Sequence, residues 1–229
     1  MQRPVSNRRS FFQSGMDSFW GRIADTLDLN EPLAFLGFDK SYVKLRREAM
    51  ATDFEVLYCN YEKTQMRLTA SKVLNEIDYF DSLLNIWKGD SELKRINQQA
   101  FLEPVEVCEE VFGLIKLAKD FFLETQGAFD ITATPLVRCW GFFQRDGHLP
   151  SQPEIEKAQD QVGMNYVDLN EEKRTVFFQK PGIELTPASL GKGYALDRAL
   201  RVAHREGLRT ILLNGGFSSV LVSGSPKWR

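Results

Sequence analysis

Residues 190–198 read Leu190-Gly191-Lys192-Gly193-Tyr194-Ala195-Leu196-Asp197-Arg198. The pattern predicts a Gly-Lys-Gly turn that opens a helix running to about residue 206. Bare backbone N–H groups, the positive end of the helix dipole and the Lys192 ammonium would meet there, which is a physical basis for binding an anion. The spacing matches neither the Gly-x-x-x-x-Gly-Lys-Ser/Thr phosphate loop nor the dinucleotide pattern Gly-x-Gly-x-x-Gly. Taken alone, the residues favour an ordinary strand-to-helix turn with a solvated Lys192.

A second segment upstream reads Gly127-Ala128-Phe129-Asp130. Gly127 suits the left-handed cap of a helix expected over residues 106–124. The small residues would let a ligand approach the backbone, while Phe129 would pack on a ring and Asp130 would accept a hydrogen bond. The competing interpretation is a capped helix with Phe129 in the core.

Hydrophobic periodicity around these two segments predicts an interleaved series of helices and strands. Helices are expected over residues 66–84, 91–97, 106–124, 151–161 and 190–206. Strands are expected over residues 52–59, 165–169, 175–179, 183–186, 210–213 and 218–222. Several strand pairs are joined by tight turns. The expected class is therefore α+β, a mixed fold of antiparallel strand pairs packed by amphipathic helices, and not a doubly wound parallel sheet.

Residues 1–45 are weakly patterned, and we expect a weakly ordered N-terminal extension with a short amphipathic helix at 20–29. The segment at 7–12 resembles a twin-arginine export signal, but polar residues follow where an apolar stretch is needed. An ordinary basic patch is the preferred interpretation. No apolar run approaches the ~18 residues of a membrane span. The expected location is cytoplasmic, with a periplasmic or membrane-associated location as the alternative.

The composition of the 229-residue chain argues against several classes of protein. An apolar content of 43% is enough for a real core, and a net charge of −2 argues against a nucleic-acid partner. Three widely spaced cysteines without a C-x-x-C pair argue against a disulfide framework or a structural zinc site. The two histidines, His148 and His204, lie far apart, which excludes a His-based metal centre within the chain.

In order and spacing, five motifs resemble those of the FAD:protein FMN transferases, the ApbE-like flavin transferases. The resemblance runs from about residue 46 to residue 229 and defines one expected domain over 46–229. The matching motifs are Met50-Ala51-Thr52, Asp90-Ser91-Glu92-Leu93-Lys94-Arg95-Ile96-Asn97, Gly127-Ala128-Phe129-Asp130 with Pro135-Leu136-Val137 and Trp140-Gly141-Phe142, Gly191 to Arg198, and Asn214-Gly215-Gly216.

The resemblance implies an enzyme that holds FAD and Mg²⁺ and moves the FMN part of FAD onto a Ser or Thr hydroxyl of a target flavoprotein, releasing AMP. It places Ser189 at the position of a metal ligand. Thr186 stands where the family usually has an Asp, so a hydrogen-bonding oxygen is kept and a charge is lost. By position, the residues implied to contact FAD are Met50, Trp87, Ala128, Phe129, Asp130, Thr186 and Lys192.

The same resemblance implies that related chains continue past the position of Arg229. In the family the further strands carry an Asp/Thr pair for the metal and a His-x-x-Asp-Pro motif with a catalytic His. We therefore expect a chain truncated at its C-terminal end, with no catalytic residue assigned and with weak or absent transfer. The alternatives are a flavin-binding or FAD-sequestering module, an interaction protein without a ligand, and hydrolysis of FAD to FMN and AMP. The target flavoprotein is not identified by the sequence.

Overall fold

The computed structural model describes residues 42–59, 65–87, 89–143 and 147–224. The N-terminal extension expected over residues 1–45, with its helix at 20–29, lies almost entirely outside these described residues. In the described part the chain forms two antiparallel sheets and a set of amphipathic helices, so the expected α+β class is confirmed.

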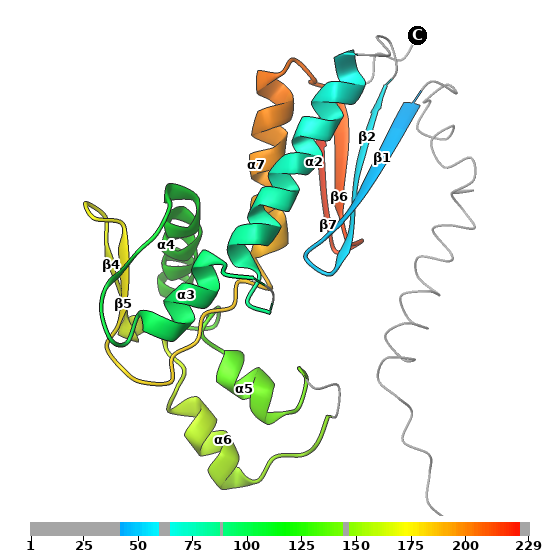
Figure 1. The fold of residues 1–229 in the computed structure, drawn as a ribbon. Helices are drawn as coiled ribbons and strands as arrows, with labels where there is room; N and C mark the ends of the chain where they lie inside the picture. The colour runs from blue at the N-terminus through cyan, green and yellow to red at the C-terminus, as the bar shows by residue number, and fades with distance from the viewer. Residues whose placement is uncertain (1–41, 60–64, 88, 144–146, 225–229) are drawn as a thin grey trace, which may run out of the picture.

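The first sheet has the strand order β1-β2-β6-β7, and every neighbouring pair in it is antiparallel. Its strands are β1 (Tyr42–Ala49), β2 (Thr52–Cys59), β6 (Ile211–Gly215) and β7 (Ser219–Ser223). Figure 1 shows α2 (Gln65–Leu84) and α7 (Gly191–Arg205) side by side against one face of this sheet. The apolar stripe predicted for the helix at 66–84 packs here, because Ala70, Val73, Ile77 and Phe80 are all buried.

The strand β1 was not revealed by the sequence pattern, and neither were the short strand at 105–106 and the short helix at 134–139. Strand β1 begins at Tyr42 and therefore crosses the boundary expected at residues 45/46. Charged side chains are interspersed with apolar ones along β1. The guanidinium of Arg46 forms a bidentate ion pair with the carboxylate of Asp53 on β2, with N–O distances of 2.7 and 2.5 Å. These charges weaken the apolar alternation by which a strand is recognised from sequence.

The second sheet has the order β3-β5-β4 and is also antiparallel. Its strands are β3 (Val105–Glu106), β4 (Val167–Asn170) and β5 (Thr175–Phe178). Together with α3 (Glu92–Gln99) and α4 (Glu109–Glu124) it encloses a second apolar core, which includes Ile96, Ile115 and Phe178. Two further helices, α5 (Thr134–Cys139) and α6 (Gln152–Gln159), lie beyond it (Figure 1).

Two expected elements begin two or three residues later than predicted, and one expected strand is absent, each for a local reason. The helix expected from residue 106 begins at Glu109, because Val105–Glu106 pairs with β5. The strand expected from residue 165 begins at Val167, after a 3-10 turn at Met164–Tyr166. Residues 183–186 are not a strand.

The segment at 183–186 is held by other partners. The side chain of Asn97 forms two hydrogen bonds with the backbone of Leu185, at 2.9 and 2.8 Å. The N–H of Thr186 donates to the carbonyl of Ile131 at 2.9 Å. The apolar alternation that predicted a strand is real, since Ile183 and Leu185 are buried in the second core. Within the described residues, no helix is long and apolar enough to span a membrane.

Candidate functional site

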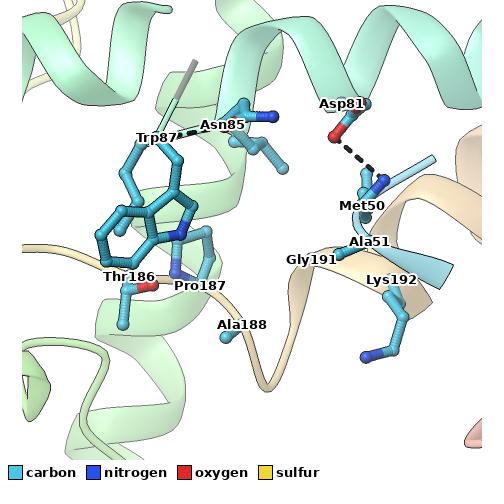
Figure 2. Close-up of a pocket in the computed structure, with 12 residues that line it drawn as sticks. Met50, Ala51, Asp81, Asn85, Trp87, Thr186, Pro187, Ala188, Gly191 and Lys192 are labelled. Carbon is cyan, nitrogen blue, oxygen red and sulfur yellow. Dashed lines mark hydrogen bonds between the residues drawn. The ribbon is translucent and has the colours of Figure 1, made fainter. Parts of the chain in front are cut away.

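A cavity of about 210 Å³ lies where the two cores meet. Its walls come from the β1–β2 turn, the end of α2 and the loop after it, the segment before α7 and the first turn of α7 (Figure 2). The residues that line it are Met50, Ala51, Asp81, Leu84, Asn85, Ile86, Trp87, Thr186, Pro187, Ala188, Gly191 and Lys192. Four residues predicted to contact FAD thus come together here: Met50, Trp87, Thr186 and Lys192.

The N-terminus of α7 forms the electropositive wall of the cavity. The helix begins at Gly191 without a side-chain cap and without an acidic residue in its first turn. The N–H groups of Leu190 and Gly191 both donate to the carbonyl of Pro187, at 2.9 and 2.6 Å. Among the described residues that line the cavity, Lys192 adds the one cationic side chain. A helix N-terminus with a lysine beside it attracts an anion such as a phosphate.

The two glycines of this turn leave space above the backbone. A Cβ atom placed on Gly193 would meet no heavy atom within 4 Å, and one on Gly191 would come no closer than 3.5 Å to Leu84. Packing among the described residues therefore does not require glycine at position 193. The open space is what a ligand needs in order to approach the backbone closely.

The next residue, Tyr194, ties α7 to α4. Its ring meets Phe80 edge to face at 5.5 Å between centroids, and its hydroxyl donates to the carbonyl of Glu110 at 3.3 Å. Burial raises the pKa of the Tyr194 phenol above its usual value. The contacts fix the first turn of α7 between the two cores.

The β1–β2 turn forms another wall of the cavity. Met50 and Ala51 both have left-handed backbone angles, with φ of 49° and 57°. The N–H of Met50 donates to Oδ1 of Asp81 on α2 at 3.0 Å (Figure 2). Of the lining residues that the structure describes, Asp81 is the one that is acidic. No sequence pattern singles it out, because its position beside the apolar stripe of a helix carries no signal of a site.

Trp87 stands at the rim of the cavity with 62% of its surface exposed. Its backbone N–H donates to Oδ1 of Asn85 at 3.0 Å, and its ring meets Phe143 edge to face at 5.0 Å between centroids. The guanidinium of Arg138 lies 5.5 Å from the Phe143 ring and pairs with Glu184 at 2.6 Å. An exposed aromatic ring held in this way offers a surface for stacking.

Ala128, Phe129 and Asp130 lie outside the residues that line the cavity. Ala128 is exposed, while Phe129 packs against the second core and meets Phe121 edge to face at 5.8 Å. The segment borders the cavity wall through the bond from Thr186 N–H to the Ile131 carbonyl. Its geometry matches the capped-helix interpretation, because Gln126 and Gly127 are left-handed and the N–H of Gly127 donates to the carbonyl of Phe122 at 2.8 Å.

Both carboxylate oxygens of Asp130 already accept hydrogen bonds within the protein. Oδ1 accepts from the backbone and the hydroxyl of Thr132, at 2.7 and 2.6 Å, and Oδ2 accepts from Met164 N–H at 3.1 Å. Thr132 is itself buried and accepts from the N–H of Gly163 at 2.7 Å. Asp130 therefore stabilises the wall behind Thr186.

Ser189, the predicted metal ligand, lies on an exposed turn just before α7 and does not line the cavity. Mg²⁺ prefers near-octahedral coordination by oxygen, and Ser189 offers one hydroxyl. Among the residues that the structure describes, no group of three or more His, Cys, Asp or Glu is placed to hold a metal. These residues do not by themselves make up a coordination shell for Mg²⁺.

The motif at residues 90–97 is a scaffold for the cavity. The hydroxyl of Ser91 accepts the N–H of Lys94 at 3.1 Å, capping α3, and donates to the carbonyl of Asn85 at 2.7 Å. Asn97, at the other end of the motif, holds Leu185 next to Thr186. One short helix thus positions the two loops that carry Trp87 and Thr186.

Comparison with known proteins places this geometry in a family context. The model of the ApbE family matches residues 50–229. An FAD:protein FMN transferase of Klebsiella pneumoniae is 30% identical over 173 residues, which are 74% of this chain and 49% of that protein. One from Escherichia coli K12 is 31% identical over 149 residues, which are 63% of this chain and 42% of that protein.

Solved structures agree with these matches. The crystal structure of the ApbE protein from Thermotoga maritima superposes with a TM-score of 0.74 at 29% identity, covering 82% of this chain and 60% of that one. The flavin transferase ApbE from Vibrio cholerae, at 21% identity, has the same fold with a TM-score of 0.72, covering 81% of this chain and 60% of that one. The chain spans about half the length of the curated relatives it matches.

Proposed function

Since this chain belongs to the ApbE family, we propose that its cavity binds FAD for the transfer of the FMN part to a hydroxyl of a target flavoprotein. We propose that the transfer depends on Mg²⁺ and releases AMP. The residues proposed to bind FAD are Met50, Trp87, Thr186 and Lys192. Ala128, Phe129 and Asp130 remain predicted contacts, which FAD would reach only beyond the cavity wall.

The observation that supports the proposal is that one cavity combines an electropositive surface with an exposed aromatic surface. FAD consists of two flat ring systems joined through a pyrophosphate. The uncapped N-terminus of α7 with Lys192 suits the pyrophosphate, and the exposed ring of Trp87 suits one of the ring systems. Space over Gly193 lets phosphate oxygens approach the backbone.

The proposed reaction is a displacement at phosphorus. The oxygen of a Ser or Thr hydroxyl forms a bond to the phosphorus of the FMN half, and the bond from that phosphorus to the bridging oxygen breaks. AMP leaves with the bonding electron pair, and the hydroxyl proton passes to solvent. Lys192 and the backbone N–H groups of α7 offset the negative charge on the phosphate oxygens.

Mg²⁺, when bound, would neutralise pyrophosphate oxygens, with Ser189, phosphate and water as its oxygen ligands. In the proposed reaction, the residues of this chain bind and orient FAD. No residue is assigned as the base.

A transfer assay tests the proposal. The chain is incubated with Mg²⁺, FAD and a flavoprotein that accepts FMN, and the acceptor is then denatured and inspected for covalent flavin fluorescence. We expect weak covalent labelling of the acceptor, with one AMP released for each flavin attached. FAD binding with no AMP release would favour the flavin-sequestering alternative, and AMP release without labelling of the acceptor would favour hydrolysis.

A further inference from the structure

The two residues between β1 and β2 are held in a conformation that their side chains disfavour. Met50 and Ala51 have φ of 49° and 57°, so both central residues of this two-residue turn are left-handed. Tight hairpins commonly use such turns, but Asn and Gly are the residues that adopt them at low cost. This turn contains neither Asn nor Gly, so contacts with the surrounding structure have to stabilise its left-handed backbone conformation.

A hydrogen bond from outside the hairpin reaches this turn, in addition to the packing of the Met50 side chain against the first core. Oδ1 of Asp81 accepts the N–H of Met50 at 3.0 Å, from a position 31 residues away in the chain. Figure 2 shows the Asp81 carboxylate projecting from α2 toward this N–H. Hydrogen bonds from a backbone N–H to a carboxylate are among the stronger ones in proteins.

We infer that Asp81 is a positioning residue for the ligand site: it anchors the strained Met50–Ala51 turn to α2 and so keeps Met50 at the cavity wall. The expected effect of Asp81 on ligand binding rests on the proposed function, because FAD is taken to be the bound ligand. Asp81 acts through Met50 and needs no contact with FAD. The anchoring depends on an oxygen acceptor at residue 81, not on its charge.

Asp78 offers a matched control on the same helix. It lies one turn earlier in α2 and pairs with Arg47 of β1, so it joins α2 to the strand that leads into the turn. Both partners of that pair are partly exposed, and such pairs contribute little to stability. Asp78 does not line the cavity.

The first test measures FAD affinity by quenching of flavin fluorescence in the wild-type chain and in D81A, D81N and D78A. We expect D81A to weaken FAD binding about tenfold, the loss that corresponds to one good hydrogen bond. D81N keeps an oxygen acceptor and restores affinity to within about threefold of wild type, and D78A binds as wild type does. Wild-type affinity in D81A, or no rescue by D81N, would overturn the inference.

The second test separates anchoring from any other role of Asp81. Glycine adopts left-handed angles freely, so A51G makes the turn less dependent on its anchor. The loss caused by D81A should therefore shrink from about tenfold to about threefold when A51G is also present. Equal losses in the two backgrounds would show that Asp81 acts on FAD by a route other than the turn.

The third test needs no ligand. Hydrogen exchange at the Met50 amide should be slow in the wild-type chain and in D78A, and at least tenfold faster in D81A. Should the wild-type chain fail to bind FAD, the proposed function would fall together with the expected effect of Asp81 on ligand binding. Slow exchange at Met50 would still support the anchor, and fast exchange in the wild-type chain would overturn it.

Discussion

The indole ring of Trp87 meets the phenyl ring of Phe143 edge to face, with 5.0 Å between their centroids. The two residues belong to loops that follow different helices, α2 and α5. The guanidinium of Arg138 lies over the Phe143 ring. The ion pair between Arg138 and Glu184 connects Arg138 to the segment before Thr186. The contact pre-orients an indole that would otherwise be free to rotate at the rim of the cavity, and pre-orientation lowers the entropy cost of binding a ring system.

Trp87 can be tested by removing its ring. W87A should weaken FAD binding by about 1–2 kcal/mol, roughly tenfold, because a stacking surface is lost. W87F should keep most of the affinity. Fluorescence titration with FAD measures both, and F142A removes a comparably exposed aromatic, 60% against 62%, that does not line the cavity. Equal effects of W87A and F142A would contradict a direct role for Trp87.

Lys192 is expected to pair with phosphate oxygens. K192A should lower FAD affinity about tenfold or more, and the affinity of the variant should depend less steeply on ionic strength, because one charge-assisted contact is gone. K192R should retain binding in part. The control is K116A, which removes a lysine paired with Glu171 on the surface. If K192A bound FAD as tightly as K116A, the pyrophosphate would not lie at the N-terminus of α7.

Gly193 allows the stability of the fold to be separated from binding. A Cβ at Gly193 meets nothing within 4 Å, and alanine is a better helix former, so G193A should raise the free energy of unfolding by up to about 0.5–1 kcal/mol. The same methyl group would occupy space that FAD needs over the backbone, so affinity should fall. Urea unfolding and FAD titration of the same variant check the two effects. Unchanged affinity in a stabilised G193A would place FAD away from this turn.

Asn97 should matter for stability. N97A removes two hydrogen bonds to the Leu185 backbone and leaves that backbone without its partners, at a cost of about 2–3 kcal/mol in the free energy of unfolding. Its neighbour Gln98 is exposed, and Q98A should change stability by less than about 0.5 kcal/mol. Urea unfolding compares the two. A loss below about 0.5 kcal/mol in N97A would show that α3 does not hold the segment before Thr186.

The raised pKa of Tyr194 predicts the direction of one pH effect. The folded state holds the phenol proton more tightly than the unfolded chain does, so the unfolded chain deprotonates first as the pH rises. The contribution of Tyr194 to stability is therefore complete below the ordinary tyrosine pKa of about 10 and is lost as the pH rises above it. Urea unfolding across this range should show a shallower alkaline loss in Y194F than in the wild-type chain. Identical slopes would contradict the prediction.

Much of the fold follows from the sequence, for reasons that particular elements show. The strand at 52–59 and the helix at 66–84 were predicted nearly to the residue, because their apolar faces have clear periods of two and of three to four. The strand β1 was missed because charged side chains interrupt its pattern. Residues 183–186 carry the alternation of a strand, but the partner that holds them is the side chain of Asn97, which no local pattern reveals.

The site was predictable in part. Met50, Trp87, Thr186 and Lys192, which span more than half of the chain, were grouped by resemblance alone, and the structure brings them to one cavity. Asp81 was not found, because a carboxylate on a helix is ordinarily a solvated group. Its role depends on a turn that lies 31 residues away. The segment at 127–130 has the geometry of a helix cap beside the cavity, which the motif alone could not distinguish from a ligand contact.

A crystal structure of this chain with FAD would show directly whether the cavity is the flavin site. We expect the pyrophosphate at the N-terminus of α7 within hydrogen-bonding distance of Lys192, and a ring system of FAD stacked on Trp87. A flavin bound elsewhere on the chain, or no flavin at saturating FAD, would contradict this expectation.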